Sequence, residues 1–235
     1  MNPPPAAQDN RTARLAGSLY LAMAVFSGFG LLYVPSLLVV PGDATVTATN
    51  IIASEGLFRS AILAGLVGQV IFVFLILVLY KLLAGVHRGL AVAMAVLALL
   101  GVPIAFLNEA NLLSVLVLLN GPEYLAVFDT TQLHAQAMLL LDNRDHGILL
   151  AQIFWGLWLF PLGSLVTRSR FLPRLLGILL IVGGLGYVID ASAAILLPAA
   201  GIAISQFTFV GELLFPLWLL AKGVDPERGE KNALA

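Results

Sequence analysis

The chain has 235 residues, of which 60% are hydrophobic and only 11% are charged. A soluble domain of this length cannot bury so much apolar surface, and the mean hydropathy of +1.00 therefore indicates an integral membrane protein. The net charge of -1 gives no information about nucleic-acid binding, and we predict no nucleic-acid partner. The absence of cysteine excludes disulfides, thiol catalysis and cysteine metal sites.

Six long apolar stretches follow a polar N-terminal segment. We expect residues 1–14 to form a disordered cytoplasmic tail, because three consecutive prolines are followed there by polar residues. Each apolar stretch comes close to the about 20 residues that a helix needs to cross roughly 30 Å of hydrocarbon. A transmembrane domain is therefore predicted over 15–222, ahead of a cytoplasmic tail at 223–235. The predicted spans are 15–40, 57–83, 89–119, 148–166, 175–197 and 206–220.

The longest connection, residues 120–147, contains one further helical pattern. Between Thr130 and Leu141 the apolar residues fall on one side of a helix that is too short to span, so we expect it to lie flat on the outer surface. The polar run at 142–146 is then expected at the mouth of the next span. The predicted fold class is all-α: an integral membrane bundle of six transmembrane helices with one short outer-surface amphipathic helix.

Lysine and arginine are distributed unevenly between alternate connections. The N-terminal tail, the second loop, the fourth loop and the C-terminal tail hold two, two, three and three of the twelve, which leaves only Arg59 and Arg144 on the opposite side. Because basic residues accumulate on the cytoplasmic side of membrane proteins, both termini are predicted to be cytoplasmic.

The carboxyl group of Glu109 lies well inside the third predicted span. A charge at that depth costs about 2.5–3.5 kcal/mol on insertion scales, so such a residue usually faces a protein interior or a wet cavity. A rise of about 1.5 Å per residue also places Gln152, Asp190 and Glu212 in the outer half of the bilayer. We therefore expect an outward-facing acidic cavity. The candidate ligand-binding residues are Asn108, Glu109, Asn111, Gln152, Tyr187, Asp190 and Glu212.

Lysine and arginine occur only near the ends of the predicted spans, and Arg59, at the outer end of the second span, is the basic residue nearest to these acids by depth. Burial without a charged partner favours the neutral acid, which can donate a proton. The candidate catalytic residues are therefore Glu109, Asp190 and Glu212. A bound cation could neutralise them instead. The structural alternative is that each acid is a neutral hydrogen-bond partner between helices.

Histidine and aspartate residues near the polar run are the remaining candidates for metal ligands. The spacing of His134, Asp142, Asp145 and His146 matches no standard zinc pattern. The sequence also has no phosphate-binding loop and no H-E-x-x-H motif. We therefore predict no metal site and no cofactor.

Several short motifs together resemble a known family. The resemblance is carried by Asn108-Glu109 and by the runs R-L-A-G-S-L-Y at 14–20, Q-I-F-W-G-L-W-L-F-P-L-G at 152–163, F-L-P-R-L-L-G at 171–177 and G-L-G-Y-V-I-D at 184–190. The family resembled is one of small bacterial multi-pass membrane proteins catalogued as a domain of unknown function. The resemblance implies location in the bacterial cytoplasmic (inner) membrane and supplies no activity.

Three functional hypotheses remain open, and all three take the lipid bilayer as a partner. The first is an acidic cavity that binds or transports a small cationic or amphipathic ligand, in a chain small enough to require a homo-oligomer. The second is an intramembrane enzyme that uses acid catalysis on a lipidic or isoprenoid substrate, with aromatic side chains stabilising carbocations. The third is a structural or accessory membrane protein.

Overall fold

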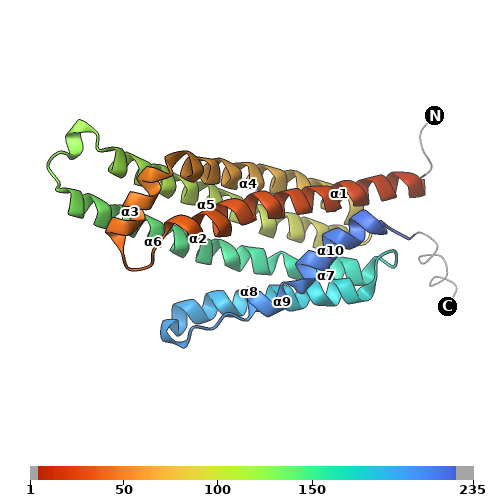
Figure 1. Cartoon of the computed structure of the whole chain (residues 1–235). Coiled ribbons are helices and arrows are strands. Elements are labelled where there is room, and N and C mark those ends of the chain that lie inside the picture. The colour runs from red at the N-terminus through yellow and green to blue at the C-terminus, as the bar shows by residue number, and fades with distance from the viewer. Residues whose placement is uncertain (1–4, 226–235) are drawn as a thin grey trace. The chain divides into compact units, whose positions relative to one another are not determined.

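The computed structural model describes residues 5–225, and throughout that part of the chain the regular elements are helices (Figure 1). The elements in chain order are α1 (Pro5–Gly28), the π-helix η1 (Phe29–Tyr33), α2 (Val34–Leu38), α3 (Ala44–Ala53), α4 (Glu55–Leu83), α5 (Arg88–Asn120), the 3-10 helix η2 (Glu123–Leu125), α6 (Thr130–Leu157), α7 (Leu159–Arg168), α8 (Arg174–Leu196), the 3-10 helix η3 (Pro198–Ala200), α9 (Ser205–Thr208) and α10 (Val210–Ala221).

Between residues 5 and 225, five helical segments are long and apolar enough to cross a membrane, which agrees with the predicted all-α membrane architecture. These segments are Asp9–Leu38, Glu55–Leu83, Arg88–Asn120, Thr130–Arg168 and Arg174–Leu196. The sixth predicted span, 206–220, is not confirmed. It corresponds to α9 and α10, and the segment Ser205–Ala221 is classed among the shorter apolar helices. At 1.5 Å per residue it extends only about 25 Å, less than the hydrocarbon thickness.

The prediction of a separate surface helix at 130–141 is wrong. Helix α6 begins at Thr130 and continues through the polar run to Leu157. A capping box begins it, because the Gln132 N–H donates to Asp129 Oδ1 and the Asp129 N–H donates to Gln132 Oε1. The polar run at 142–146 does not end the helix, because Arg144 faces inward while the other four side chains are exposed.

The N-terminal prediction also differs from the structure. Helix α1 begins at Pro5, so residues 5–14 are helical rather than disordered, and Pro5 occupies the helix start that proline favours. Ala13 is fully buried, and Asn10 Oδ1 accepts a hydrogen bond from the Val224 N–H at 2.9 Å. The predicted tail at 223–235 lies outside the described residues from 226 onward.

The helices divide into two compact units. The first unit comprises residues 1–21, 71–102 and 150–235, and α8 packs in it against α7 and α10 (Figure 1). Close backbone contact joins α7 and α8, since a Cβ atom added at Gly177 would lie 2.5 Å from the Gly163 carbonyl oxygen. Gly163 and Gly177 have no side chains, and small residues of this kind allow membrane helices to pack closely.

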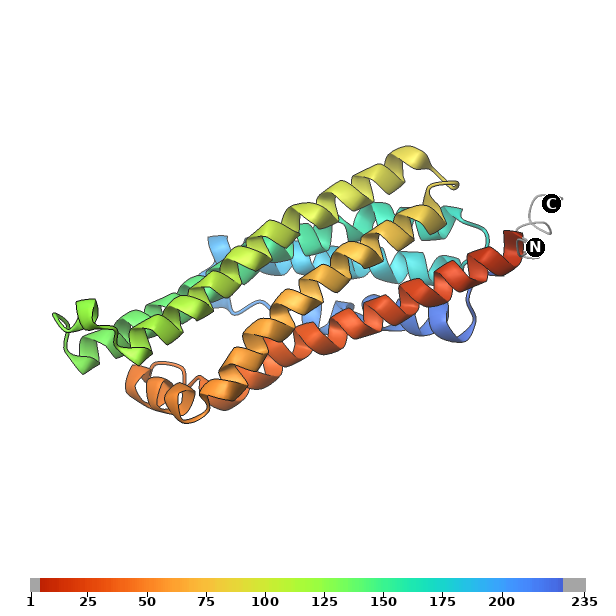
Figure 2. The ribbon, with the colours of Figure 1, turned by 90° about the horizontal axis from the view of Figure 1, so that it is seen from above.

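The second unit comprises residues 22–70 and 103–149 and has its own apolar core. Figure 2 shows α3, in orange, folded against the end of α2, where the Asn50 side chain donates to the Leu38 carbonyl oxygen at 3.1 Å. The core residues come from α2, α3, α4, α5 and α6. They include Val34, Leu38, Ile51, Phe58, Ile62, Leu112, Val115, Leu116 and Leu141.

The close seam between α7 and α8 predicts that Gly177→Ala lowers the free energy of unfolding by about 1–3 kcal/mol, because the added methyl group would meet backbone atoms. The matched control is Gly56→Ala on α4, where no atom lies within 4 Å of the added carbon. We expect the control to be neutral or slightly stabilising. Equilibrium unfolding of the purified variants in detergent measures both, and equal stabilities would contradict the seam.

Candidate functional site

The first unit holds Glu212 between two tyrosine hydroxyl groups. The Tyr20 hydroxyl, on α1, donates to Glu212 Oε1 at 2.7 Å. The Tyr187 hydroxyl, on α8, also forms a side-chain hydrogen bond with Glu212, which lies on α10. Three helices therefore converge on one carboxyl group. Tyr187 and Glu212 were predicted as site residues, whereas Tyr20 was not, because nothing in the sequence places it near the other two.

Aromatic rings surround the hydroxyl-bearing ring of Tyr20. Its centroid lies 6.3 Å from that of Trp158 and 6.4 Å from that of Phe215, both in edge-to-face geometry. Phe72 packs against Trp158 in turn, at 5.4 Å. Trp158 and Phe215 are each only 1% exposed. The rings fix the position of Tyr20, so its hydroxyl is held in place to donate to Glu212.

Asp190 binds backbone groups at the start of α9. Its Oδ1 accepts from the Ile204 N–H at 2.6 Å, and its Oδ2 accepts from the Ser205 N–H at 2.8 Å. A carboxylate at a helix start satisfies N–H groups that have no partner within the helix. Asp190 therefore anchors the loop that leads into α9 and α10. Its predicted role in ligand binding stays a prediction.

Gln152 lies in the same unit, on α6, and is half-buried. Among the described residues, no hydrogen bond joins it to the Glu212 group. Its role as a ligand contact stays a prediction.

The second unit holds Glu109, which is 6% exposed and lies on α5. Its carboxyl group packs so closely on Gly65 of α4 that a Cβ atom there would overlap it. The neighbouring Asn108 side chain packs in the same way on Gly147 of α6. Asn111 is half-buried on the same helix and has no hydrogen-bond partner among the described residues. Two glycines thus make room for adjacent polar side chains between helices.

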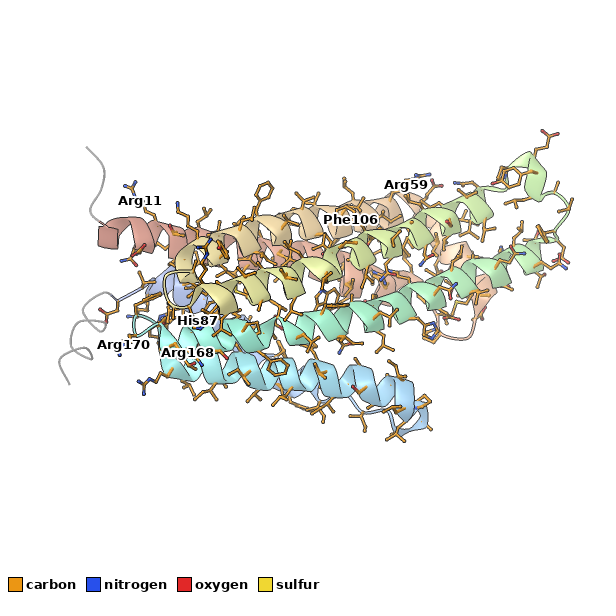
Figure 3. All side chains as sticks on the ribbon, turned by 180° about the vertical axis from the view of Figure 1, so that it is seen from behind. Arg11, Arg59, His87, Phe106, Arg168 and Arg170 are labelled. Carbon is orange, nitrogen blue, oxygen red and sulfur yellow. The ribbon has the colours of Figure 1, made fainter. Side chains whose placement is uncertain are left out.

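Arg144 of α6 is a member of this group that the sequence analysis missed. It is 4% exposed and interacts electrostatically with Glu109. The predicted span at 148–166 excluded Arg144, whereas the structure places this residue inside the continuous helix α6. Arg59, the partner expected from depth, instead pairs with Glu55 at 2.6 Å and is 54% exposed (Figure 3).

The Arg144 guanidinium is held by a backbone carbonyl that a proline leaves free. Its Nη2 donates to the Gly30 carbonyl oxygen at 3.1 Å. In an α-helix the Val34 N–H would donate to Gly30, but in the π-helix η1 it donates to Phe29. The next residue, Pro35, has no N–H. The side chain of Arg144 therefore satisfies a carbonyl group that the helix itself leaves unpaired.

Each group of polar residues is defined within its own unit. Glu109 and Asn108 belong to the second unit with Arg144, and Asp190 and Glu212 belong to the first. The expectation that these acids share one cavity stays a prediction.

Comparison with known proteins identifies the family. A family model described as "Domain of unknown function (DUF4386)" matches residues 15–223. The chain belongs to this family. The resemblance inferred from the short motifs is thereby confirmed. An "Uncharacterized protein" of the archaeon Archaeoglobus fulgidus is 45% identical over 76 residues, which cover 32% of this chain.

That match spans 44% of the archaeal relative's own length. No solved structure is similar to the chain. Since neither the family description nor the relative states an activity, function has to be argued from the DUF4386 chain's own polar groups.

The buried position of Arg144 predicts that Arg144→Met lowers the free energy of unfolding by about 3–5 kcal/mol, because it leaves the Gly30 carbonyl and Glu109 without their basic partner. The matched control, Arg59→Met, removes an exposed ion pair and should cost at most about 1 kcal/mol. Denaturant unfolding in bicelles compares the two variants. Equal losses would show that Arg144 has no special structural role.

Proposed function

We propose that this DUF4386 chain binds a small amphipathic cation at Glu212 and carries it across the membrane. The observation that supports this most directly concerns the carboxyl group of Glu212, which lies among apolar helices. Two tyrosine hydroxyl groups bind it, but no basic side chain of the described residues pairs with it. Among the described residues, the ion pairs within 4.0 Å are Arg59–Glu55 and Arg144–Asp145, and neither involves Glu212.

A cation would complete the charge of this site. Hydroxyl donors lower the cost of a buried carboxylate but leave its net charge in place. Glu212 and Tyr187 are half-buried residues, so part of each lies at the surface of the helices. A ligand with one positive charge would therefore be attracted to the carboxylate and could approach it from the exposed side of Glu212 and Tyr187.

The surroundings favour a cation with an apolar part. The ring of Tyr187 lies beside the carboxyl group, and aromatic faces attract cations. The neighbouring surfaces of α8 and α10 expose apolar side chains such as Leu185 and Leu213. An amphipathic ligand could place its charge at Glu212 and its apolar part along these helices.

Basic residues indicate the orientation that we propose. Figure 3 shows Arg11, Arg168 and Arg170 at one end of the first unit. By the bias of lysine and arginine toward the cytoplasmic side, that end faces the cytoplasm, with both termini there. The proposed location is the bacterial cytoplasmic membrane, with Glu212 in the outer half of the bilayer. Transport by so small a chain would require a homo-oligomer.

The alternative is an intramembrane enzyme in which Glu212 protonates a lipidic substrate. The aromatic cluster of Tyr20, Trp158 and Phe215 favours this reading, because aromatic rings stabilise carbocations. The two hydroxyl donors argue against it. Hydrogen bonds donated to a carboxylate stabilise its ionised form and so oppose burial, which favours the neutral acid that proton donation requires. Cation binding is therefore the better supported function.

Binding of tetraphenylphosphonium, a lipophilic cation, tests the proposal. We expect Glu212→Gln to weaken binding at least about tenfold, a change of about 1.4 kcal/mol, and Tyr20→Phe to weaken it less because the carboxylate remains. Isothermal titration calorimetry on the purified protein in detergent provides the measurement, and uptake into proteoliposomes tests transport.

The control is Glu55→Gln, which removes an acid that is already paired with Arg59. It should leave tetraphenylphosphonium binding unchanged. Equal affinity in the native protein and in a folded Glu212→Gln variant would contradict the proposed site.

A further inference from the structure

Within the part of the chain that the structure describes, three buried polar atoms of the second unit have no hydrogen-bond partner. They are Gln69 Oε1 on α4, Glu109 Oε2 on α5 and Arg144 Nε on α6. Most buried polar groups in folded proteins are hydrogen-bonded, so a group left unpaired calls for a physical explanation. Here two acceptors and one donor come from three helices of the same unit.

Glu109 and Arg144 interact without touching. Among the described residues, no ion pair within 4.0 Å joins a guanidinium nitrogen of Arg144 to a carboxyl oxygen of Glu109. The guanidinium group is held instead by the Gly30 carbonyl oxygen at 3.1 Å and by the exposed Asp145 at 3.8 Å. Arg144 therefore keeps its position whether or not Glu109 carries a charge.

This arrangement differs from a structural ion pair. A buried arginine and carboxylate that serve only stability usually form two parallel hydrogen bonds, which offset the cost of removing both from water. Glu109 accepts no hydrogen bond from the described residues. Its carboxyl group can gain a proton without breaking any protein contact, while the fixed positive charge of Arg144 stabilises the ionised form.

We propose that Glu109 is a reversible proton-binding site with Arg144 as its fixed counter-charge. On uptake, a proton from water adds to Oε2 of the carboxylate and forms an O–H bond. On release, the same bond breaks and the proton returns to water, and no other bond changes. This inference rests on the second unit alone, so it does not depend on cation binding at Glu212.

The groups that face Glu109 support such a role. Helix α6 supplies Arg144, and the charged or titratable residues next to it, Asp142, Asp145 and His146, are exposed. Helix α4 supplies uncharged groups: Gly65 against the carboxyl group and Gln69 one turn further along the same face. The unpaired oxygen of Gln69 is the kind of acceptor that a protonated carboxyl group needs. The π-helix η1 contributes the Gly30 carbonyl, which Arg144 occupies.

Infrared spectroscopy of the purified full-length protein tests the proposal, because a protonated carboxyl group has a C=O band that a carboxylate lacks. As the pH is raised from about 4 to about 9, a range that brackets carboxyl titration in proteins, we expect one such band to disappear in the native protein. It should be missing in Glu109→Gln and retained in Glu212→Gln.

Two further variants separate a proton site from a structural acid. Arg144→Gln removes the positive charge and should make the band persist to a pH higher by about one unit or more. Glu109→Asp keeps an acid and should shift the band frequency, which provides the assignment if Glu109→Gln does not fold. A Glu109 band that stays unchanged over the whole pH range would overturn the proposal, and so would the lack of any band from Glu109.

Discussion

The cost of placing a charge among apolar helices determines how the polar residues of this protein are arranged. Water is scarce at membrane depth, so each buried charge or unpaired carbonyl has to find a partner within the protein. Arg144 serves two such needs at once, since it hydrogen-bonds the Gly30 carbonyl and interacts electrostatically with Glu109. The π-helix and Pro35 create the first need, and the acid on α5 creates the second.

The two units stabilise their acids in different ways. In the first unit, the hydroxyl groups of Tyr20 and Tyr187 hydrogen-bond Glu212, and no ion pair among the described residues involves it. In the second unit, a basic side chain compensates Glu109 at a distance and leaves its hydrogen-bonding capacity unused. An uncompensated charge suits a cationic ligand, whereas an acid without hydrogen bonds suits proton uptake. The chemistry proposed for each group follows from this difference.

Glycine residues make both arrangements sterically feasible. Gly65 accommodates the Glu109 carboxyl group, and Gly147 accommodates Asn108. In the first unit, a Cβ atom at Gly17 would lie 2.8 Å from the Pro216 carbonyl oxygen, so the glycine lets α1 approach the helix that carries Glu212. Polar groups from separate helices can meet only where the backbones come this close.

Hydrophobicity and length alone determined the all-α membrane architecture and the helices near 57–83, 89–119 and 175–197, because an unbroken apolar run of about 20 residues has few other stable structures. The same reasoning identified Glu109, Asp190 and Glu212 as unusual. It failed where polarity was taken as a boundary: the run at 142–146 lies inside α6, since a helix can bury one residue of a polar run and expose the rest. Only tertiary structure decided that Arg144 accompanies Glu109 and that Tyr20 accompanies Glu212, because both pairings depend on which helix faces meet.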